Sequence, residues 1–111
     1  MPDGREPRPS ELLDVVVRGD REAVIAVDGE LDVSETQWFT ARVSEALEKD
    51  PPSLAIDAGR LTYLDSSGLR SLLLARAAAI QAGVAFYVSE ASPVLRNLAE
   101  RTGLRRLLLD G

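Results

Sequence analysis

The strongest constraint on the fold is an alternation of short apolar runs with longer segments of helical periodicity. The apolar runs cover residues 12–17, 23–27, 53–56 and 84–88, and helical patterns cover 35–48, 69–82 and a third segment that begins at Ser92 and Pro93. Runs of this length are typical of strands, and the longer patterns are typical of amphipathic helices. Strands that alternate with helices pair largely in parallel. The sequence therefore predicts an α/β domain.

The two ends of the chain refine this architecture. The first two runs are joined by a short polar connection around Gly19, which predicts an opening β-hairpin. The last apolar run, residues 107–109, is expected to form a short strand or a packing segment. We expect a mixed sheet of about four to five strands with about three helices, its parallel pairs joined by right-handed crossovers.

Residue types mark the ends of the expected helices. Ser34 stands three residues before Gln37, the spacing of a capping box at the start of the first helix. Ser92 and Pro93 are expected to be the cap and the first residue of the third helix. Gly83 suits the position just beyond the end of the second helix.

Apolar spacing predicts which helix faces are buried. The first helix is expected to bury Phe39, Val43, Ala46 and Leu47, and the second Leu69, Leu72, Leu73, Ala77 and Ile80. Trp38 lies beside the buried face of the first helix, and we expect it to be half exposed. We interpret it as edge packing, with anchoring of a partner as the alternative.

Length and charge limit the classes of protein. The chain has 111 residues, enough for one core but not for two. We expect residues 1–10 to be a flexible N-terminal tail without a secretory signal, and residues 11–111 to be the domain. A net charge of −5 disfavours binding to nucleic acid or to an anionic membrane. No apolar run approaches the ~20 residues of a membrane span. We therefore expect a cytoplasmic protein.

The chain contains neither cysteine nor histidine. This excludes a Ser-His-Asp triad and a thiol nucleophile, and removes the favoured zinc ligands. We expect no catalytic residue, cofactor or metal, and hence no enzyme. A phospho-receiver using Asp57 or Asp65 is the enzyme class considered, but an acidic pair after the first strand and a lysine near the site are missing. A glycine-rich phosphate loop is missing as well.

Residues 65–69 read Asp-Ser-Ser-Gly-Leu and stand where the second helix is expected to begin. Backbone N–H groups at a helix start are unpaired and the dipole is positive, so a phosphate on a serine there is tolerated. The alternative is that Asp65 or Ser66 only caps the helix. Asp32 follows the second strand, and parallel pairing would bring both segments to one edge of the sheet.

The pair of segments Gly-Glu-Leu-Asp (29–32) and Asp-Ser-Ser-Gly-Leu (65–69) resembles the STAS domain family (sulphate transporter and anti-sigma factor antagonist). The resemblance covers residues 12–109 and is closest to stand-alone bacterial anti-sigma factor antagonists. It implies that the protein binds an anti-sigma factor of the serine-kinase type and so frees a sigma factor. It also implies that this kinase phosphorylates Ser66, which ends binding, and that a serine phosphatase reverses the modification.

The residues expected to contact the partner are Asp32, Asp65, Ser66, Ser67, Gly68, Leu69 and Arg70. Many stand-alone antagonists carry glycine at the position of Arg70, and an arginine there would either narrow partner choice or pair with a phosphate on Ser66. For Asp32, a role as a helix cap is the alternative. A second function consistent with the resemblance is a non-catalytic STAS subunit of a stress-signalling scaffold or of a transporter complex.

Overall fold

Four strands form one mixed sheet in the computed structural model, which describes residues 13–18 and 22–109. The strands are β1 (Leu13–Arg18), β2 (Ala23–Leu31), β3 (Ser53–Leu64) and β4 (Ala85–Ala91), in the order β1-β2-β3-β4. β1 pairs antiparallel with β2, and β3 is parallel to both β2 and β4. The predicted hairpin pairing and mixed sheet are confirmed. The predicted tail and the turn around Gly19 lie outside the described residues.

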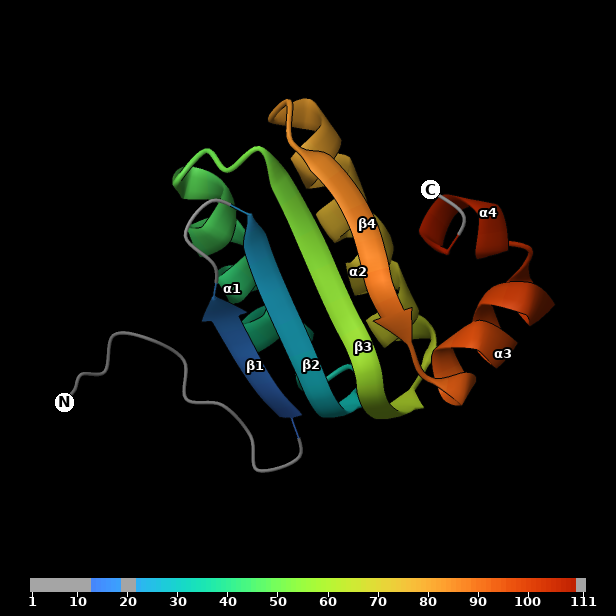
Figure 1. Cartoon of the computed structure of the whole chain (residues 1–111). Helices are drawn as coiled ribbons and strands as arrows, with labels where there is room; N and C mark the ends of the chain where they lie inside the picture. Colours follow the sequence, from blue (N-terminus) through green and yellow to red (C-terminus); the bar gives the residue numbers. More distant parts are fainter. Residues whose placement is uncertain (1–12, 19–21, 110–111) are drawn as a thin grey trace, which may run out of the picture.

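Two long helices cover the same face of the sheet (Figure 1). They are α1 (Thr36–Glu48) and α2 (Ser66–Gln81), and α3 (Pro93–Thr102) and α4 (Arg105–Leu108) follow β4. Ser92 caps α3, because its Oγ accepts a hydrogen bond from the N–H of Leu95 at 3.4 Å, as the sequence predicts. In the described part of the chain, we find no helix with the length and apolar character needed to span a membrane.

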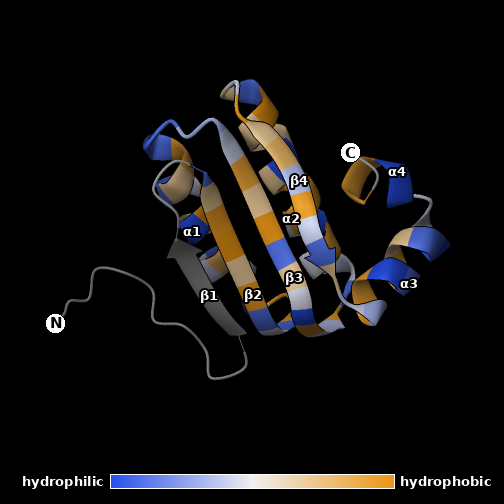
Figure 2. Ribbon diagram, viewed as in Figure 1, coloured by the Kyte–Doolittle hydropathy of each residue, from blue (hydrophilic) through white to orange (hydrophobic). Residues whose placement is uncertain are grey.

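The core lies between the sheet and the two long helices. Along β2, Ala23, Ile25 and Val27 are buried and alternate with half-buried residues, as in a strand with one well-covered face. Phe39 and Val43 of α1 pack into the same cluster. Figure 2 shows hydrophobic residues concentrated along the middle of β2 and β3.

The predicted buried face of α2 is partly wrong. Leu69 and Leu72 are buried, but Ala77 is exposed and 55% of Ile80 is exposed. The helix instead turns Ala75 and Ala79 toward the core, where both are almost completely buried. The prediction placed the stripe through Ala77 and Ile80, whereas the buried stripe continues from Leu72 through Ala75 and Ala79, whose small side chains let α2 lie close to the sheet.

Local packing overturns one further expectation and decides between the two alternatives of another. Trp38 is 7% exposed rather than half exposed, and the Arg42 guanidinium lies 4.2 Å from the centre of its ring. Of the two alternatives for residues 107–109, a short strand or a packing segment, the structure has the packing segment, with Leu108 in the core and Leu109 packed against it. Helix α4 occupies this part of the chain, because one helical turn directs both Leu104 and Leu108 toward the core.

Candidate functional site

The two motif segments meet where β2 and β3 end. Leu31 is paired with Leu64 at the last position of both strands, so Asp32 and Asp65 follow neighbouring strand ends. In Figure 1 this carboxyl edge is the lower edge of the sheet, where α1 and α2 begin. The expected meeting of the two segments at one edge is confirmed.

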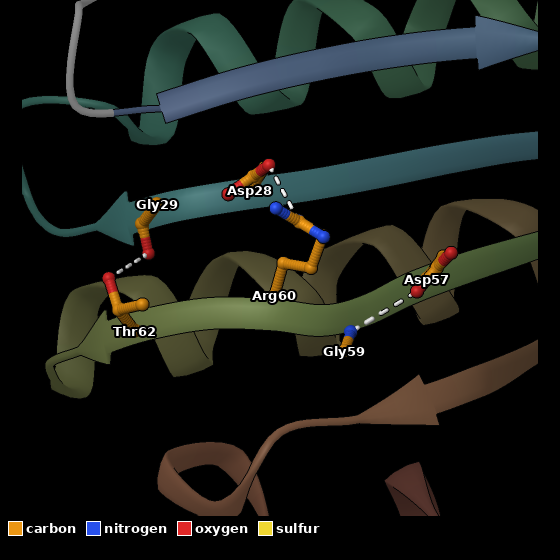
Figure 3. Close-up of polar contacts among 6 residues, drawn as sticks. All are labelled: Asp28, Gly29, Asp57, Gly59, Arg60 and Thr62. Atoms are coloured by element: carbon orange, nitrogen blue, oxygen red, sulfur yellow. Dashed lines mark hydrogen bonds and ion pairs between the residues drawn. The ribbon is translucent and has the colours of Figure 1, made fainter.

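Both strands extend further toward this edge than the apolar runs predict, and polar contacts connect their carboxyl halves (Figure 3). Arg60 pairs with Asp28 across the strands at 3.0 Å. The pairing register shifts between Gly29 and Glu30, and the hydroxyl of Thr62 donates to the Gly29 carbonyl there at 3.0 Å. These contacts hold the strand ends together where the ladder is irregular.

Gly68 brings the start of α2 into direct contact with the end of β2. A Cβ at this position would lie 2.2 Å from the Leu31 carbonyl oxygen and 2.7 Å from a methyl carbon of Leu64. No side chain fits at such distances, so glycine is required for the close approach. Gly68 therefore fixes the distance between the two segments.

Asp65 is the N-cap of α2, with an extended backbone and a side chain that accepts the Gly68 N–H at 2.8 Å. The hydroxyl of Ser71 donates to the Gly68 carbonyl at 2.7 Å, inside the protein. The cap interpretation is therefore correct for Asp65. Because Asp65 is the cap, Ser66 and Ser67 have no capping role.

Asp32 organises the loop between β2 and α1. Its Oδ1 accepts hydrogen bonds from the backbone N–H of Ser34 at 3.0 Å and from the Ser34 hydroxyl at 2.7 Å. The predicted capping box of Ser34 and Gln37 is wrong, because the N-cap of α1 is Glu35 and its side chain makes no capping bond. The Ser34 hydroxyl is instead bonded to Asp32, a local alternative to capping.

The remaining predicted site residues differ in exposure. Ser66 is exposed and Ser67 is half-buried, and neither hydroxyl makes a hydrogen bond with any described residue. Arg70 is exposed on the next turn of α2. Gly68 and Leu69 are buried, Leu69 with 4% exposure, so they support the surface from beneath. Ser66 is thus the accessible hydroxyl at the start of α2.

A shallow depression of about 230 Å³ lies beside these residues, between the starts of α1 and α2. It is lined by Val33, Thr36, Thr40, Ser67, Arg70, Ser71 and Leu74. Val33 is 68% exposed and Leu74 is 53% exposed, and the sequence reasoning selected neither. Both residues carried a signal in the sequence. Val33 is an apolar residue inside a polar loop, and Leu74 is the one of three consecutive leucines that helical spacing leaves off the predicted buried face.

The described residues contain no cluster of three or more His, Cys, Asp or Glu side chains placed to hold a metal ion.

The family model described as "Mlab, STAS domain" matches residues 15–110. The chain belongs to the STAS domain family. No curated protein matches the sequence significantly.

Several solved structures share the fold of this STAS domain. An anti-sigma factor antagonist from Mycobacterium paratuberculosis is 23% identical with a TM-score of 0.77, over 94% of this chain and 92% of that one. The anti-sigma factor antagonist SpoIIAA in its unphosphorylated form is 21% identical with a TM-score of 0.71, over 87% and 85%. Phosphorylated SpoIIAA from Bacillus is 21% identical with a TM-score of 0.66, over 87% and 88%. At these identities the likeness shows the fold.

Proposed function

We propose that this STAS domain is an anti-sigma factor antagonist, a binding protein without catalytic activity of its own. It binds an anti-sigma factor of the serine-kinase type and so frees the sigma factor that this partner holds. The observation that carries the proposal is the hydroxyl of Ser66 at the start of α2, which is exposed, bonds to no residue that the structure describes, and lies beside the loop formed by Asp32. The shared fold with anti-sigma factor antagonists supports the proposal.

The partner-facing surface consists of the β2–α1 loop and the first turns of α2. Asp32, Asp65, Ser66, Ser67 and Arg70 are the proposed contacts. Gly68 and Leu69, which are buried, hold this surface in place. The exposed apolar side chains beside the depression would be covered when the partner binds, because apolar surface contributes most to association when water is removed from it.

Phosphorylation of Ser66 ends the interaction. The kinase transfers the terminal phosphoryl group of ATP: an O–P bond forms at Ser66 Oγ, the bond to the ADP oxygen breaks, and the hydroxyl proton leaves to a base of the kinase. The phosphate adds a charge of about −1.5 to −2 next to Asp65. This charge and its desolvation disfavour an interface whose partner surface accommodates the uncharged hydroxyl of Ser66. A coupling of ~3 kcal/mol would weaken binding about a hundredfold. A serine phosphatase restores the binding form.

Binding of the partner anti-sigma kinase to four forms of the protein tests the proposal. Ser66→Asp should lose binding and melt close to wild type, because a carboxylate at a helix start is stabilised by the dipole. Ser66→Ala should bind even after incubation with the kinase and ATP. Ser89→Asp is the matched control and should bind like wild type, because Ser89 is an exposed residue of β4 whose hydroxyl makes only a long bond to the Ile56 carbonyl, at 3.4 Å.

Peptide mass spectrometry after the kinase reaction locates the modified residue. Phosphate on Ser66 supports the assignment, whereas phosphate confined to Ser67 or to another residue refutes it. If Ser66→Asp binds as well as wild type, aspartate can differ from phosphate, so the binding of wild type with phosphate on Ser66 is measured as the direct test of the switch. Tight binding of that form would refute the switch.

The second candidate function is a non-catalytic STAS subunit of a stress-signalling scaffold or of a transporter complex. The matching family model, described as "Mlab, STAS domain", gives the domain family without an antagonist function and fits this candidate as well. Size-exclusion chromatography of the protein in native extract separates the two functions. A stable, large assembly supports the subunit function. A small complex that dissociates on phosphorylation of Ser66 supports the antagonist function.

A further inference from the structure

Arg70 stands four residues after Ser66 on α2, so the two side chains project from the same face of the helix, one turn apart. Both residues are exposed. Arg70 forms no ion pair with a described residue, whereas Arg60 pairs with Asp28 and Arg42 with Glu45. An unpaired guanidinium therefore lies within one helical turn of the serine that we propose is phosphorylated.

The other charged side chains near the start of α2 are acidic. Asp65 precedes Ser66 directly, and Asp32 and Glu35 belong to the loop that follows Leu31, the residue in contact with Gly68. The carboxylates of Asp32 and Asp65 already accept backbone N–H groups. A phosphate on Ser66 would be repelled by these carboxylates, and Arg70 is the nearby cation on the same helix.

We propose that Arg70 is the intramolecular partner of a phosphate on Ser66, an inference that rests on the proposed function. An anion four residues before a cation is the more favourable order of the two on a helix. The planar guanidinium matches two phosphate oxygens at once, which a lysine ammonium does not. The phosphate is thereby held against the first turn of α2.

The pairing changes the partner-facing surface at two positions. Without phosphate, the surface presents the Ser66 hydroxyl and, beside the depression lined by Ser67 and Leu74, the Arg70 guanidinium, neither of them bonded to a residue in the described part of the chain. With phosphate, Arg70 is drawn toward Ser66 and is no longer available to an acidic group of the partner. Phosphorylation thus adds negative charge and removes a positive contact in one step.

Phosphorus NMR titration of the full chain, with phosphoserine placed at position 66 during synthesis, tests the pairing. The guanidinium should lower the second pKa of the phosphate, by roughly half a unit or more relative to Arg70→Gln. Arg70→Lys should restore part of this shift, because it keeps the charge but not the fork. Arg101→Gln, an exposed arginine of α3, is the matched control and should leave the phosphate pKa unchanged.

The neighbouring titratable groups are Glu30, Asp32, Glu35, Tyr63 and Asp65, and they are the same in all variants. The difference between wild type and Arg70→Gln therefore isolates Arg70. An equal phosphate pKa in these two proteins, or an equal shift in Arg101→Gln, overturns the pairing. The phosphate is built in chemically, so this result does not depend on the kinase. Failure of the proposed function would show instead in the partner-binding and mass-spectrometric tests.

Discussion

The two edges of the parallel part of the sheet use their polar side chains in opposite ways. At the amino edge, Glu22 just before β2 accepts hydrogen bonds from the Ser53 hydroxyl, at 2.8 Å, and from the Tyr87 hydroxyl of β4. Side chains at the starts of three neighbouring strands are thus bonded to one another. We call this edge closed, because its polar side chains are engaged in hydrogen bonds with one another.

At the carboxyl edge, the carboxylates of Asp32 and Asp65 accept backbone N–H groups, which stabilises the loop and the helix start. The hydroxyls of Ser66 and Ser67 are left without a partner among the described residues. At this edge the two carboxylates are engaged with the backbone N–H groups of Ser34 and Gly68, while the two serine hydroxyls are available. The amino edge thus connects neighbouring strands through its side chains, whereas the carboxyl edge carries the two serine hydroxyls on which the proposed binding surface rests.

The largest expected effect comes from filling the contact that positions the carboxyl edge. Gly68→Ala should destabilise the domain by about 3 kcal/mol, because its Cβ would collide with the Leu31 carbonyl at 2.2 Å and backbone must move. Gly83→Ala is the control: its φ of 76° strains alanine, but nothing lies within 4 Å of the added carbon. We expect a loss of about 1 kcal/mol there. Urea denaturation measures both, and equal losses would refute the close-contact argument.

The next effect separates the two roles of Asp32. Asp32→Asn keeps an oxygen that can accept the Ser34 N–H, so the urea midpoint should change little. It removes the charge, so anti-sigma binding should fall roughly tenfold if the partner donates to this carboxylate. Asp32→Ala should lose both the binding and part of the stability. Unchanged affinity of the folded Asp32→Asn protein would assign Asp32 to the loop alone.

A smaller effect is expected for the cap of α2. Asp65→Ala removes the acceptor of the Gly68 N–H and should cost about 1 kcal/mol of folding free energy. Asp65→Asn should recover most of this loss, since asparagine caps helices nearly as well. If both variants unfold at the urea midpoint of wild type, the carboxylate contributes nothing to the helix start. The contrast between engaged carboxylates and free hydroxyls would then fail for α2.

Signals confined to a few residues predicted much of this structure. Ser92 with Pro93 gave the start of α3, and the segments 29–32 and 65–69 gave the place of the site, since parallel strands bring their carboxyl ends together. Contacts between distant residues were not predictable. The approach of Gly68 to Leu31 depends on how β2 and α2 meet, which spacing along the chain does not encode. The bond from the Ser34 hydroxyl to Asp32 is local, and there the residue types allowed either a capping box or a bond to the preceding carboxylate. Residues 107–109 were expected to form a short strand or a packing segment, and the burial of Leu108 in the core, a long-range contact, decides between the two.

The smallest effect concerns the closed amino edge and depends on pH. The hydrogen bond from Tyr87, and then that from Ser53, lowers the pKa of Glu22 below its ordinary value of 4.5. The bond to Glu22 raises the pKa of Tyr87 above 10.0. The Glu22 contribution to stability is therefore complete above the unfolded pKa of 4.5 and is lost as pH falls through the folded pKa. The Tyr87 contribution is complete below 10.0 and is lost as pH rises through its folded pKa.

Urea midpoints of wild type and Tyr87→Phe measured from acid to neutral pH test this edge. The wild type should be the more stable near neutrality, and the difference should shrink as Glu22 becomes protonated, because a neutral carboxyl is the weaker acceptor. Tyr63→Phe is the control, since 47% of Tyr63 is exposed and its hydroxyl bonds to no described residue. Its urea midpoint should equal that of wild type at every pH.

A difference for Tyr87→Phe that stays constant through the acid range would mean that the charged carboxylate is not what Tyr87 stabilises. The amino edge would then be no more closed than the carboxyl edge.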